Sequence, residues 1–205
     1  MYKLSAEKLS KRFGSRKVFE EISFELTTGQ TLAVIGPNGA GKTTLLLTLM
    51  GGYTPSRGKV TYLFDNKILD EETLRDKTAL VAPYLNLYDS LTAEENLVFF
   101  MTMAGGSVTG KEISALLERV GLTGRGDDLV GSYSSGMKQR LKYAAALLKK
   151  PIFLFLDEPT SNLDEAGKKI AFDIIEELKQ KIIVVIATNE PKERDLAEQV
   201  CRIDG

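Results

Sequence analysis

The sequence contains no histidine among its 205 residues. This absence excludes imidazole catalysis, imidazole metal ligands and the usual titrating switch near neutral pH. Cys201 is the only cysteine, so no internal disulfide can form. No apolar run approaches the ~20 residues of a membrane span, and the first residues lack the apolar core of a signal peptide. We therefore expect a cytoplasmic protein without a membrane span of its own.

An excess of positive charge is also missing. The sequence has 27 Lys and Arg against 28 Asp and Glu, which gives a net charge of −1. The basic surface typical of nucleic-acid-binding domains is therefore not expected, and we predict no nucleic-acid partner. A length of 205 residues with 43% apolar content is enough for a single domain with a sizeable core.

One glycine-rich stretch organises the rest of the sequence. Residues 36–44 read GPNGAGKTT and fit the phosphate-loop pattern G-x-x-x-x-G-K-[ST]. The apolar run before it predicts a buried strand over 31–35, and the apolar run after it predicts a helix. Glycines let backbone N–H groups approach phosphate oxygens, and a helix N-terminus adds partial positive charge. In this pattern Lys42 would reach the β- and γ-phosphates and the Thr43 hydroxyl would bind Mg²⁺. The alternative is a glycine turn before an ordinary helix.

The remaining hydrophobic pattern predicts an α/β core that is interrupted by helices. Apolar residues at helical spacing, beginning with Leu97, Phe100 and Met101, predict three helices within residues 84–149 whose apolar faces pack in the core. We expect one domain over 1–205, with a core lobe at 1–83 and 141–205 and a helical subdomain at 84–140. Residues 2–35 are predicted to be rich in strands, further strands are predicted at 59–64, 78–82, 152–156, 181–187 and 200–203, and a fifth helix at 165–180.

A second motif follows the apolar run 152–156, which ends in Asp157 and Glu158. Acidic residues at the carboxyl end of such a strand face the crevice where α/β sheets bind ligands. Asp157 would hold Mg²⁺ through a water or another ligand of the ion, and Glu158 would polarise a water for attack on the γ-phosphate. An acidic pair that merely starts a helix is the alternative.

A third motif, YSSGMKQR at residues 133–140, opens one of the predicted helices. Ser134 or Ser135 suits a helix N-cap, which is the simple explanation. A serine–glycine turn at a helix start is also an anion site. It lies too close in sequence to Asp157 to form a second nucleotide site of its own. It makes more sense as a patch that one subunit presents to the nucleotide of another.

Together these motifs resemble the ATPase subunits of ABC transporters, over nearly the whole length of the chain. The loop at 36–44 matches the family's GPNGAGKTT, and YSSGM resembles a form of its LSGGQ signature. Residues 152–158 resemble the Walker B strand with its catalytic glutamate, and SNLD at 161–164 resembles the D-loop. The resemblance implies a P-loop NTPase (RecA-like) core with a mainly parallel sheet, an N-terminal antiparallel β subdomain and an inserted helical subdomain.

The resemblance also implies a mechanism with ATP and Mg²⁺ between two subunits, in a homodimer or heterodimer arranged head to tail. Glu158 would act on the water, Thr43 and Asp157 would hold Mg²⁺, and Ser134 and Gly136 of the partner subunit would touch the γ-phosphate. Phe13 falls where the family places an aromatic against adenine; a core or edge aromatic is the alternative. The phosphate-loop residues implied to bind nucleotide are Gly36, Asn38, Gly39, Ala40, Gly41, Lys42, Thr43 and Thr44.

Two positions depart from the family pattern. Asn189 stands where the family has its switch histidine, and Pro83 stands where the Q-loop glutamine is expected. An amide can donate a hydrogen bond to the γ-phosphate but cannot become cationic, so a charge-assisted bond is lost. The sequence therefore predicts slow hydrolysis, or a site that a partner subunit completes.

The family further implies a transmembrane permease subunit as partner. Four of the five residues 84–88, YLNLY, are apolar or aromatic, and the segment lies where the membrane subunit docks in the family; burial within the lobe is the alternative. The compact chain and LTAEENL at 91–97 resemble small exporter ATPases, including the haem-exporter type, and predict no C-terminal regulatory domain. We expect an ATPase of an exporter, peripheral on the inner face of the cell membrane. The alternatives are a soluble ABC ATPase without transport and a degenerate nucleotide-binding module.

Overall fold

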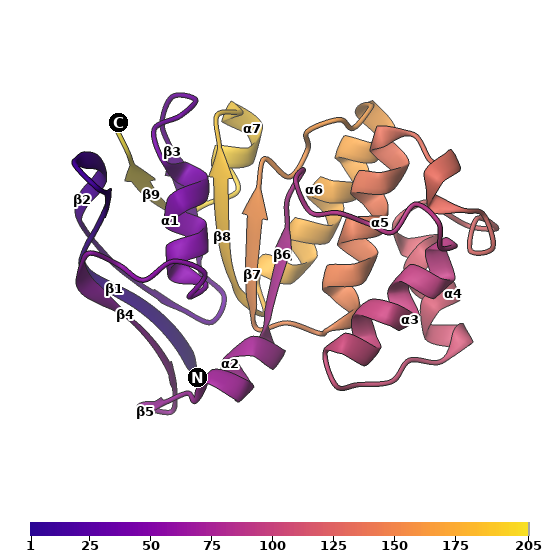
Figure 1. The fold of residues 1–205 in the computed structure, drawn as a ribbon, viewed down its shortest axis with the longest axis horizontal. Helices are drawn as coiled ribbons and strands as arrows, with labels where there is room; N and C mark the ends of the chain where they lie inside the picture. Colours follow the sequence, from indigo (N-terminus) through magenta and orange to yellow (C-terminus); the bar gives the residue numbers. More distant parts are fainter. Residues whose placement is uncertain (205) are drawn as a thin grey trace.

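The chain forms two β-sheets with helices packed around them, and the computed structural model describes residues 1–204 (Figure 1). One sheet is antiparallel with strand order β2-β1-β4-β5, and the other is parallel with strand order β6-β7-β8-β3-β9. The predicted α/β class, with an N-terminal antiparallel sheet and a parallel core, is confirmed. Over residues 1–204, no helix has both the length and the apolar content needed to cross a membrane.

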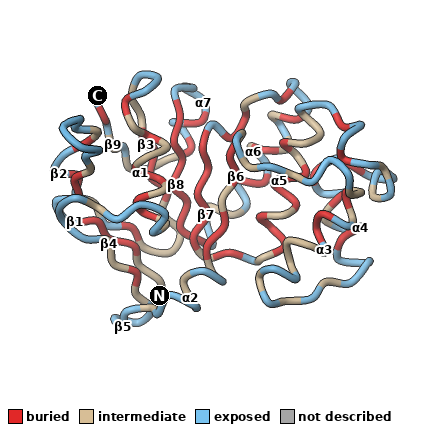
Figure 2. Tube along the Cα trace, viewed as in Figure 1, coloured by how far each residue is buried: buried red, intermediate tan, exposed pale blue. Residues whose placement is uncertain are grey.

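The parallel sheet forms the centre of the molecule. In β7 and β8 every residue is buried, as expected for strands covered on both faces (Figure 2). The register pairs Ile35 with Thr188 and Asp157 with Ala187, so three strands reach their carboxyl ends at one edge. That edge brings the phosphate loop, Asp157 and Asn189 together. The strands are β3 (Thr31–Ile35), β6 (Thr78–Val81), β7 (Phe153–Asp157), β8 (Ile183–Thr188) and β9 (Gln199–Arg202).

Alternate side chains of this sheet contribute to two separate hydrophobic cores. Phe153 and Phe155 pack in the core beneath the antiparallel sheet. Leu154 and Leu156, which point to the opposite face, pack in the core that the helices form. This alternation follows from the period-2 geometry of a strand, and it fixes β7 between the two halves of the molecule.

The antiparallel sheet is bent by bulges in two strands. Lys8 and Glu21 have φ angles of +46° and +54°, which is unusual for residues with side chains. Their freed backbone N–H groups donate to Ser23 Oγ at 2.8 Å and Ser10 Oγ at 3.0 Å. The strands are β1 (Tyr2–Phe13), β2 (Arg16–Thr27), β4 (Arg57–Phe64) and β5 (Lys67–Ile68).

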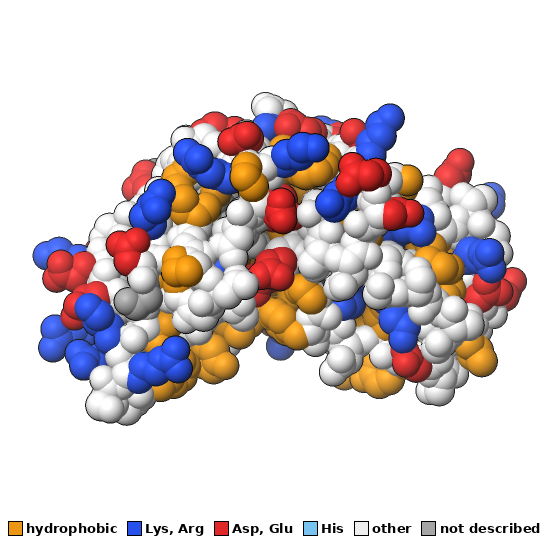
Figure 3. All heavy atoms as spheres, turned by 90° about the horizontal axis from the view of Figure 1, so that it is seen from above, with side chains coloured by type: hydrophobic (Ala, Val, Ile, Leu, Met, Phe, Trp, Pro, Cys, Tyr) orange, Lys and Arg blue, Asp and Glu red, His pale blue; other side chains and the backbone are white. Residues whose placement is uncertain are grey.

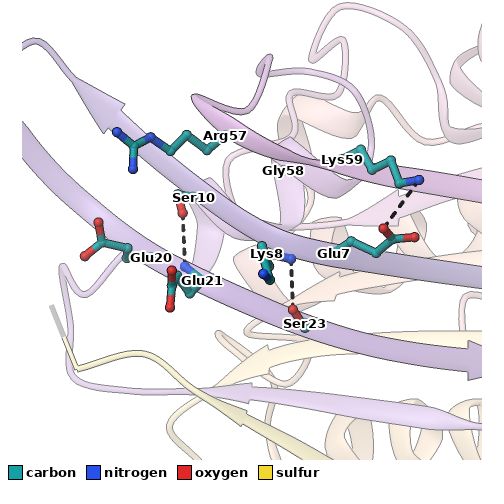
Figure 4. A pocket seen from close by; sticks show the side chains of 9 residues that line it. All are labelled: Glu7, Lys8, Ser10, Glu20, Glu21, Ser23, Arg57, Gly58 and Lys59. Carbon is teal, nitrogen blue, oxygen red and sulfur yellow. Dashed lines mark hydrogen bonds and ion pairs between the residues drawn. The ribbon is translucent and has the colours of Figure 1, made fainter.

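The bulges leave an open hollow of about 620 Å³ on the sheet surface (Figure 4). Charged side chains of both signs line it, and Lys59 pairs with Glu7 across it at 3.3 Å. The two serines already accept the bulge N–H groups, so the hollow is explained by the bend of the sheet, and we assign no ligand to it.

The helices divide between the two sides of the parallel sheet (Figure 1). The predicted helical region begins only at Ala93, because residues 82–92 form turns and irregular structure. Helix α5 runs through residue 140, and the division of the chain into a core lobe and a helical subdomain stays a prediction. The helices are α1 (Lys42–Leu49), α2 (Glu71–Lys77), α3 (Ala93–Met103), α4 (Gly110–Arg119), α5 (Ser135–Leu148), α6 (Glu165–Lys179) and α7 (Pro191–Arg194), with a short 3₁₀ turn at Val130–Ser132.

Candidate nucleotide site

The glycine-rich loop connects β3 to α1, as its sequence predicts. Gly41 has φ +108°, and a Cβ added there would lie 2.3 Å from Val18 Cγ1. A Cβ at Gly36 would lie 2.1 Å from the carbonyl oxygen of Ile203. Only glycine fits at these two positions, because the loop passes close to β2 and to the end of the chain.

Helix α1 begins without a side-chain cap. Its N-cap is Gly41, and no side chain accepts a hydrogen bond from its first turn. By contrast, a side chain caps the start of α3 (Thr92), α4 (Thr109), α5 (Ser134) and α6 (Asp164). The first N–H groups of a helix have no partner within the helix and carry partial positive charge. The bare start of α1, next to the glycine loop, therefore fits a phosphate group.

Lys42 opens α1 and folds back over the loop. Its ammonium donates to the carbonyl oxygens of Gly36 at 2.8 Å and Pro37 at 3.1 Å, and to Asn189 Oδ1 at 3.0 Å. Asn189 also donates to Asn38 Oδ1 at 2.5 Å. The residue at the switch-histidine position thus joins the phosphate loop to the end of β8.

Thr43 and Asp157 meet at the same edge. The Thr43 hydroxyl donates to Asp157 Oδ2 at 2.6 Å. Burial is the main cause that raises the pKa of Asp157, while the bond from Thr43 acts against it. A hydroxyl and a carboxylate are oxygen ligands of the kind that Mg²⁺ prefers, and Mg²⁺ sites with phosphate need few protein ligands. The donor set therefore fits Mg²⁺, with Thr43 and Asp157 as the residues that would hold it.

Glu158 directly follows β7 and is exposed at the same edge of the sheet. It has φ +45°, and its N–H donates to the Ala187 carbonyl at 2.9 Å. With Asn38 and Asn189 it lines a hollow of about 410 Å³ that extends toward Ser161 and Asn162 of the D-loop segment. A strained backbone at a charged residue in such a hollow is typical of functional positions.

Ser134 and Gly136 lie away from the phosphate loop. They belong to the start of α5, which stands on the other side of β7 and β8 from α1 (Figure 1). The Ser134 hydroxyl accepts the Met137 N–H at 3.2 Å, so the predicted N-cap is present. The structure therefore brings Lys42, Thr43, Asp157, Glu158 and Asn189 together in one site, whereas Ser134 and Gly136 belong to another part of the surface.

Phe13 ends β1 and is 46% exposed. Its ring packs edge-on against Tyr53 with centroids 5.4 Å apart, and the Lys11 ammonium lies 4.8 Å from the ring centroid. Phe13 is thus a surface aromatic rather than a core residue, and its stacking on adenine stays a prediction.

Sequence reasoning missed two residues at this site, Tyr84 and Lys142. Tyr84, which the sequence places on a docking surface, lies near Asp157, and burial together with the charge of that carboxylate raises the pKa of Tyr84. Lys142 is 8% exposed and donates to the carbonyl oxygens of Ala82 and Pro83, directly before Tyr84 in the chain. The one signal in the sequence was a lysine directly after Leu141, in the apolar stripe of a predicted helix.

The surface at the carboxyl edge of the sheet carries acidic and basic side chains side by side (Figure 3). In this view the outline is notched between the part that the antiparallel sheet forms and the part that the helices form.

Comparison with known proteins assigns the chain to a family. The family described as ABC transporter matches residues 19–161, which include the phosphate loop, the YSSGM segment and Asp157. The chain belongs to the ABC transporter family. The chain contains the ATP-binding domain of this family, and the resemblance inferred from the motifs is confirmed.

Two relatives by sequence and one solved structure show how similar the chain is to known proteins. An uncharacterized ABC transporter ATP-binding protein, YxlF of Bacillus subtilis (strain 168), is 38% identical over 97% of this ABC domain and 65% of its own length. Nod factor export ATP-binding protein I of Bradyrhizobium diazoefficiens is 33% identical over 93% of this chain and 62% of its own. The solved dimer of the ATP-binding cassette MJ0796 with ADP and Pi is 24% identical, with a TM-score of 0.85 over 98% of this chain and 94% of that one, and shows the fold alone. The chain spans 60% to 65% of the lengths of the first three curated relatives that it matches.

Proposed function

We propose that this ABC domain binds and hydrolyses ATP with Mg²⁺ and thereby powers a membrane exporter. The observation that carries the proposal is the meeting of Lys42, the Thr43–Asp157 pair and Glu158 at one edge of the parallel sheet. These are the parts that phosphoryl transfer to water requires: a cation for the phosphates, oxygen ligands for the metal and a carboxylate for the water.

Each residue has a role that follows from its place. The uncapped N–H groups of α1 would bind the phosphate oxygens, joined by Lys42 once its ammonium leaves the loop carbonyls. Thr43 and Asp157 would hold Mg²⁺, which when bound neutralises phosphate charge. Glu158 would accept a proton from the attacking water. Asn189 would donate its amide N–H to the γ-phosphate.

The Asn189 amide affects the expected rate of ATP hydrolysis. The neutral amide makes a weaker bond to a developing charge than a cationic imidazole would. We propose that the domain hydrolyses ATP slowly for this reason, unless a heteromeric partner supplies a complete second site.

We propose that the domain dimerises, because the phosphate loop and the start of α5 lie apart within one chain. Helix α5, whose first turn carries Ser134 and Gly136, stands across β7 and β8 from α1 and the phosphate loop (Figure 1), so these two residues would reach a nucleotide only in a second subunit. A head-to-tail pair, homomeric or heteromeric, would place two ATP molecules between the subunits. Loss of the γ-phosphate would then weaken the shared interface and release the pair.

A membrane permease is the proposed partner of the helical half. Tyr88, Phe99 and Phe100 form an aromatic cluster with centroids 4.7 to 6.2 Å apart. Exposed Val98 and Met103 extend it on α3. Tyr88 is exposed and the two phenylalanines are half-buried, and apolar clusters that reach the surface in this way mark contact surfaces. The name of the Nod factor relative includes export, and we propose the same direction here, with the domain on the cytoplasmic face of the membrane.

The test is steady-state hydrolysis of MgATP by the purified chain over a range of protein concentrations, beside Glu158→Gln. Turnover that rises more than linearly with protein and is lost in Glu158→Gln supports a dimeric ATPase. ATP binding without turnover would contradict hydrolysis by the chain alone and favour a nucleotide-binding module. Copurification with a membrane protein separates the transporter from a soluble ABC ATPase.

A further inference from the structure

The turn at residues 158–161 holds the candidate catalytic carboxylate in an unusual backbone conformation. Glu158 has φ +45°. Its N–H donates to Ala187 O at 2.9 Å, and its carbonyl oxygen accepts the Ser161 N–H at 3.0 Å, so both of its backbone polar groups are bonded. Pro159 stands at the second position of this turn, where the φ that its ring fixes is favoured. A left-handed conformation at a residue with a side chain costs energy and persists only where the surrounding structure imposes it.

Helix α7 supplies a buried carboxylate to this turn. Glu193 is 1% exposed, and its Oε1 accepts from Thr160 N at 2.9 Å and from Thr160 Oγ1 at 2.6 Å. Thr160 is buried as well and is the third residue of the turn. Hydrogen bonds to an ionised acceptor are about twice as strong as neutral ones. Oε2 of Glu193 is buried and has no hydrogen-bond partner among residues 1–204, so the two bonds from Thr160 compensate the burial of this carboxylate.

Helix α5 bonds to the same turn through two further buried side chains. Tyr143 is 2% exposed, and its hydroxyl donates to Pro159 O at 3.2 Å. The amide of Gln139, one helical turn earlier, donates to the same oxygen at 3.3 Å. Burial, and after it the charge of Glu193, raises the pKa of Tyr143, so the phenol stays protonated and remains a donor. Side chains of two helices therefore bond to two consecutive residues, Pro159 and Thr160, directly after Glu158.

We propose that Tyr143 and Glu193 are positioning residues that fix the turn at Pro159 and Thr160 and thereby hold the Glu158 carboxylate in place for the attacking water. Their hydrogen bonds within residues 1–204 go to the turn and not to the phosphate loop or to Asp157, so they act through the backbone of the turn. Loss of either contact should therefore slow the chemical step and leave ATP binding intact. The proposal rests on the proposed function, since it takes from it the role of Glu158.

Tyr143→Phe removes one buried oxygen and tests the turn in two independent ways. Steady-state hydrolysis of MgATP by the full chain should show kcat lowered about threefold to tenfold with KM within about twofold of the wild type, because a displaced catalytic group affects the reaction rather than binding. Hydrogen exchange followed by NMR should be about fivefold faster at the Thr160 and Ser161 amides, the size of one net hydrogen bond. The exchange measurement requires no turnover.

Tyr62→Phe is the matched control for the lost hydroxyl. Tyr62 is 5% exposed, and its hydroxyl also donates to a backbone carbonyl, Leu49 O at 2.8 Å, at the end of α1 and outside the turn. This variant should lower the melting temperature by a similar amount and leave kcat and the exchange rates at Thr160 and Ser161 as in the wild type.

Glu193→Gln is the conservative variant at the second position. Its amide oxygen can still accept both hydrogen bonds from Thr160, so we expect at least about half of the wild-type kcat. Glu193→Ala has no acceptor there and should lower kcat about tenfold without raising KM. This difference separates the hydrogen bonds to the turn from the charge of the carboxylate.

Equal exchange rates at Thr160 and Ser161 in Tyr143→Phe and Tyr62→Phe would show that Tyr143 does not fix the turn, and would overturn the proposal. Faster exchange with an unchanged kcat would show that the turn does not position Glu158, and would also overturn it. A wild-type chain that binds MgATP and never hydrolyses it would refute the proposed activity, and the exchange rates would then decide alone whether these side chains fix the turn.

Discussion

The ammonium of Lys42 lies 3.0 Å from the side-chain oxygen of Asn189, across 147 residues of sequence. The same ammonium bonds to two carbonyls of its own loop. Without nucleotide, Lys42 therefore already has three acceptors, and phosphate must replace some of them. Asn189 is at once a partner of the resting lysine and the candidate donor to the γ-phosphate.

Lys42→Met should weaken ATP binding by at least about tenfold, because the charge-assisted bonds to phosphate are lost while side-chain length is kept. Calorimetric titration of ATP measures the change. Lys111→Met, at an exposed position of α4, should bind as the wild type does. Equal affinities of the two variants would show that Lys42 does not reach the phosphates.

Asn189→His should raise turnover roughly threefold to tenfold by adding a charge-assisted bond in the transition state. The gain should be larger at pH 6 than at pH 8, since imidazole is cationic only below its ordinary pKa of about 6.5. Rates of phosphate release across this range provide the readout, with Asn189→Ala as the control that removes both amide bonds. If Asn189→His did not raise turnover at any pH, the missing histidine would not be the cause of slow hydrolysis.

Mixing two inactive variants should restore hydrolysis if the site is shared between subunits. Ser134→Asp keeps a good N-cap for α5 but places negative charge against the γ-phosphate of the partner. In a mixed pair with Lys42→Met, one site carries both changes and the other carries neither. Phosphate release should therefore exceed that of either variant alone. If both residues served the nucleotide of their own subunit, the mixture would stay inactive.

Glu193→Ala should destabilise the fold by about 1–3 kcal/mol, because two buried donors lose their acceptor. Glu193 is 1% exposed, and its Oε1 accepts from Thr160 N at 2.9 Å and Thr160 Oγ1 at 2.6 Å. Urea unfolding measures the loss. Glu190→Ala, at an exposed side chain before α7, should stay within about 0.5 kcal/mol of the wild type.

The parts that the sequence predicted well are local in the chain. The loop at 36–44, the strand that ends at Asp157 and the N-cap at Ser134 each depend on consecutive residues, and the structure contains all three. Sequence also indicated the shared edge, because strand ends in a parallel sheet meet there. The catalytic roles, the adenine contact of Phe13 and the division into lobes stay predictions.

The features of the structure that the sequence did not predict depend on tertiary packing or on helices that are exposed. Helix α2 buries none of its residues, so it has no apolar face to detect. On α3 the helical spacing was right, yet of Leu97, Phe100 and Met101 only Leu97 is fully buried. Lys142 and the Ala82 carbonyl are 60 residues apart, and no local pattern relates them.

The uncapped start of α1 has a thermodynamic consequence. A group that binds the folded chain and not the unfolded one adds RT ln(1 + [L]/Kd) to the free energy of unfolding. ATP that bonds to the first-turn N–H groups of α1 would do what Thr92, Thr109 and Asp164 do for their own helices. At a hundred times Kd it would contribute about 2.7 kcal/mol. The nucleotide concentration of the cell would then be one of the determinants of how much of this protein stays folded.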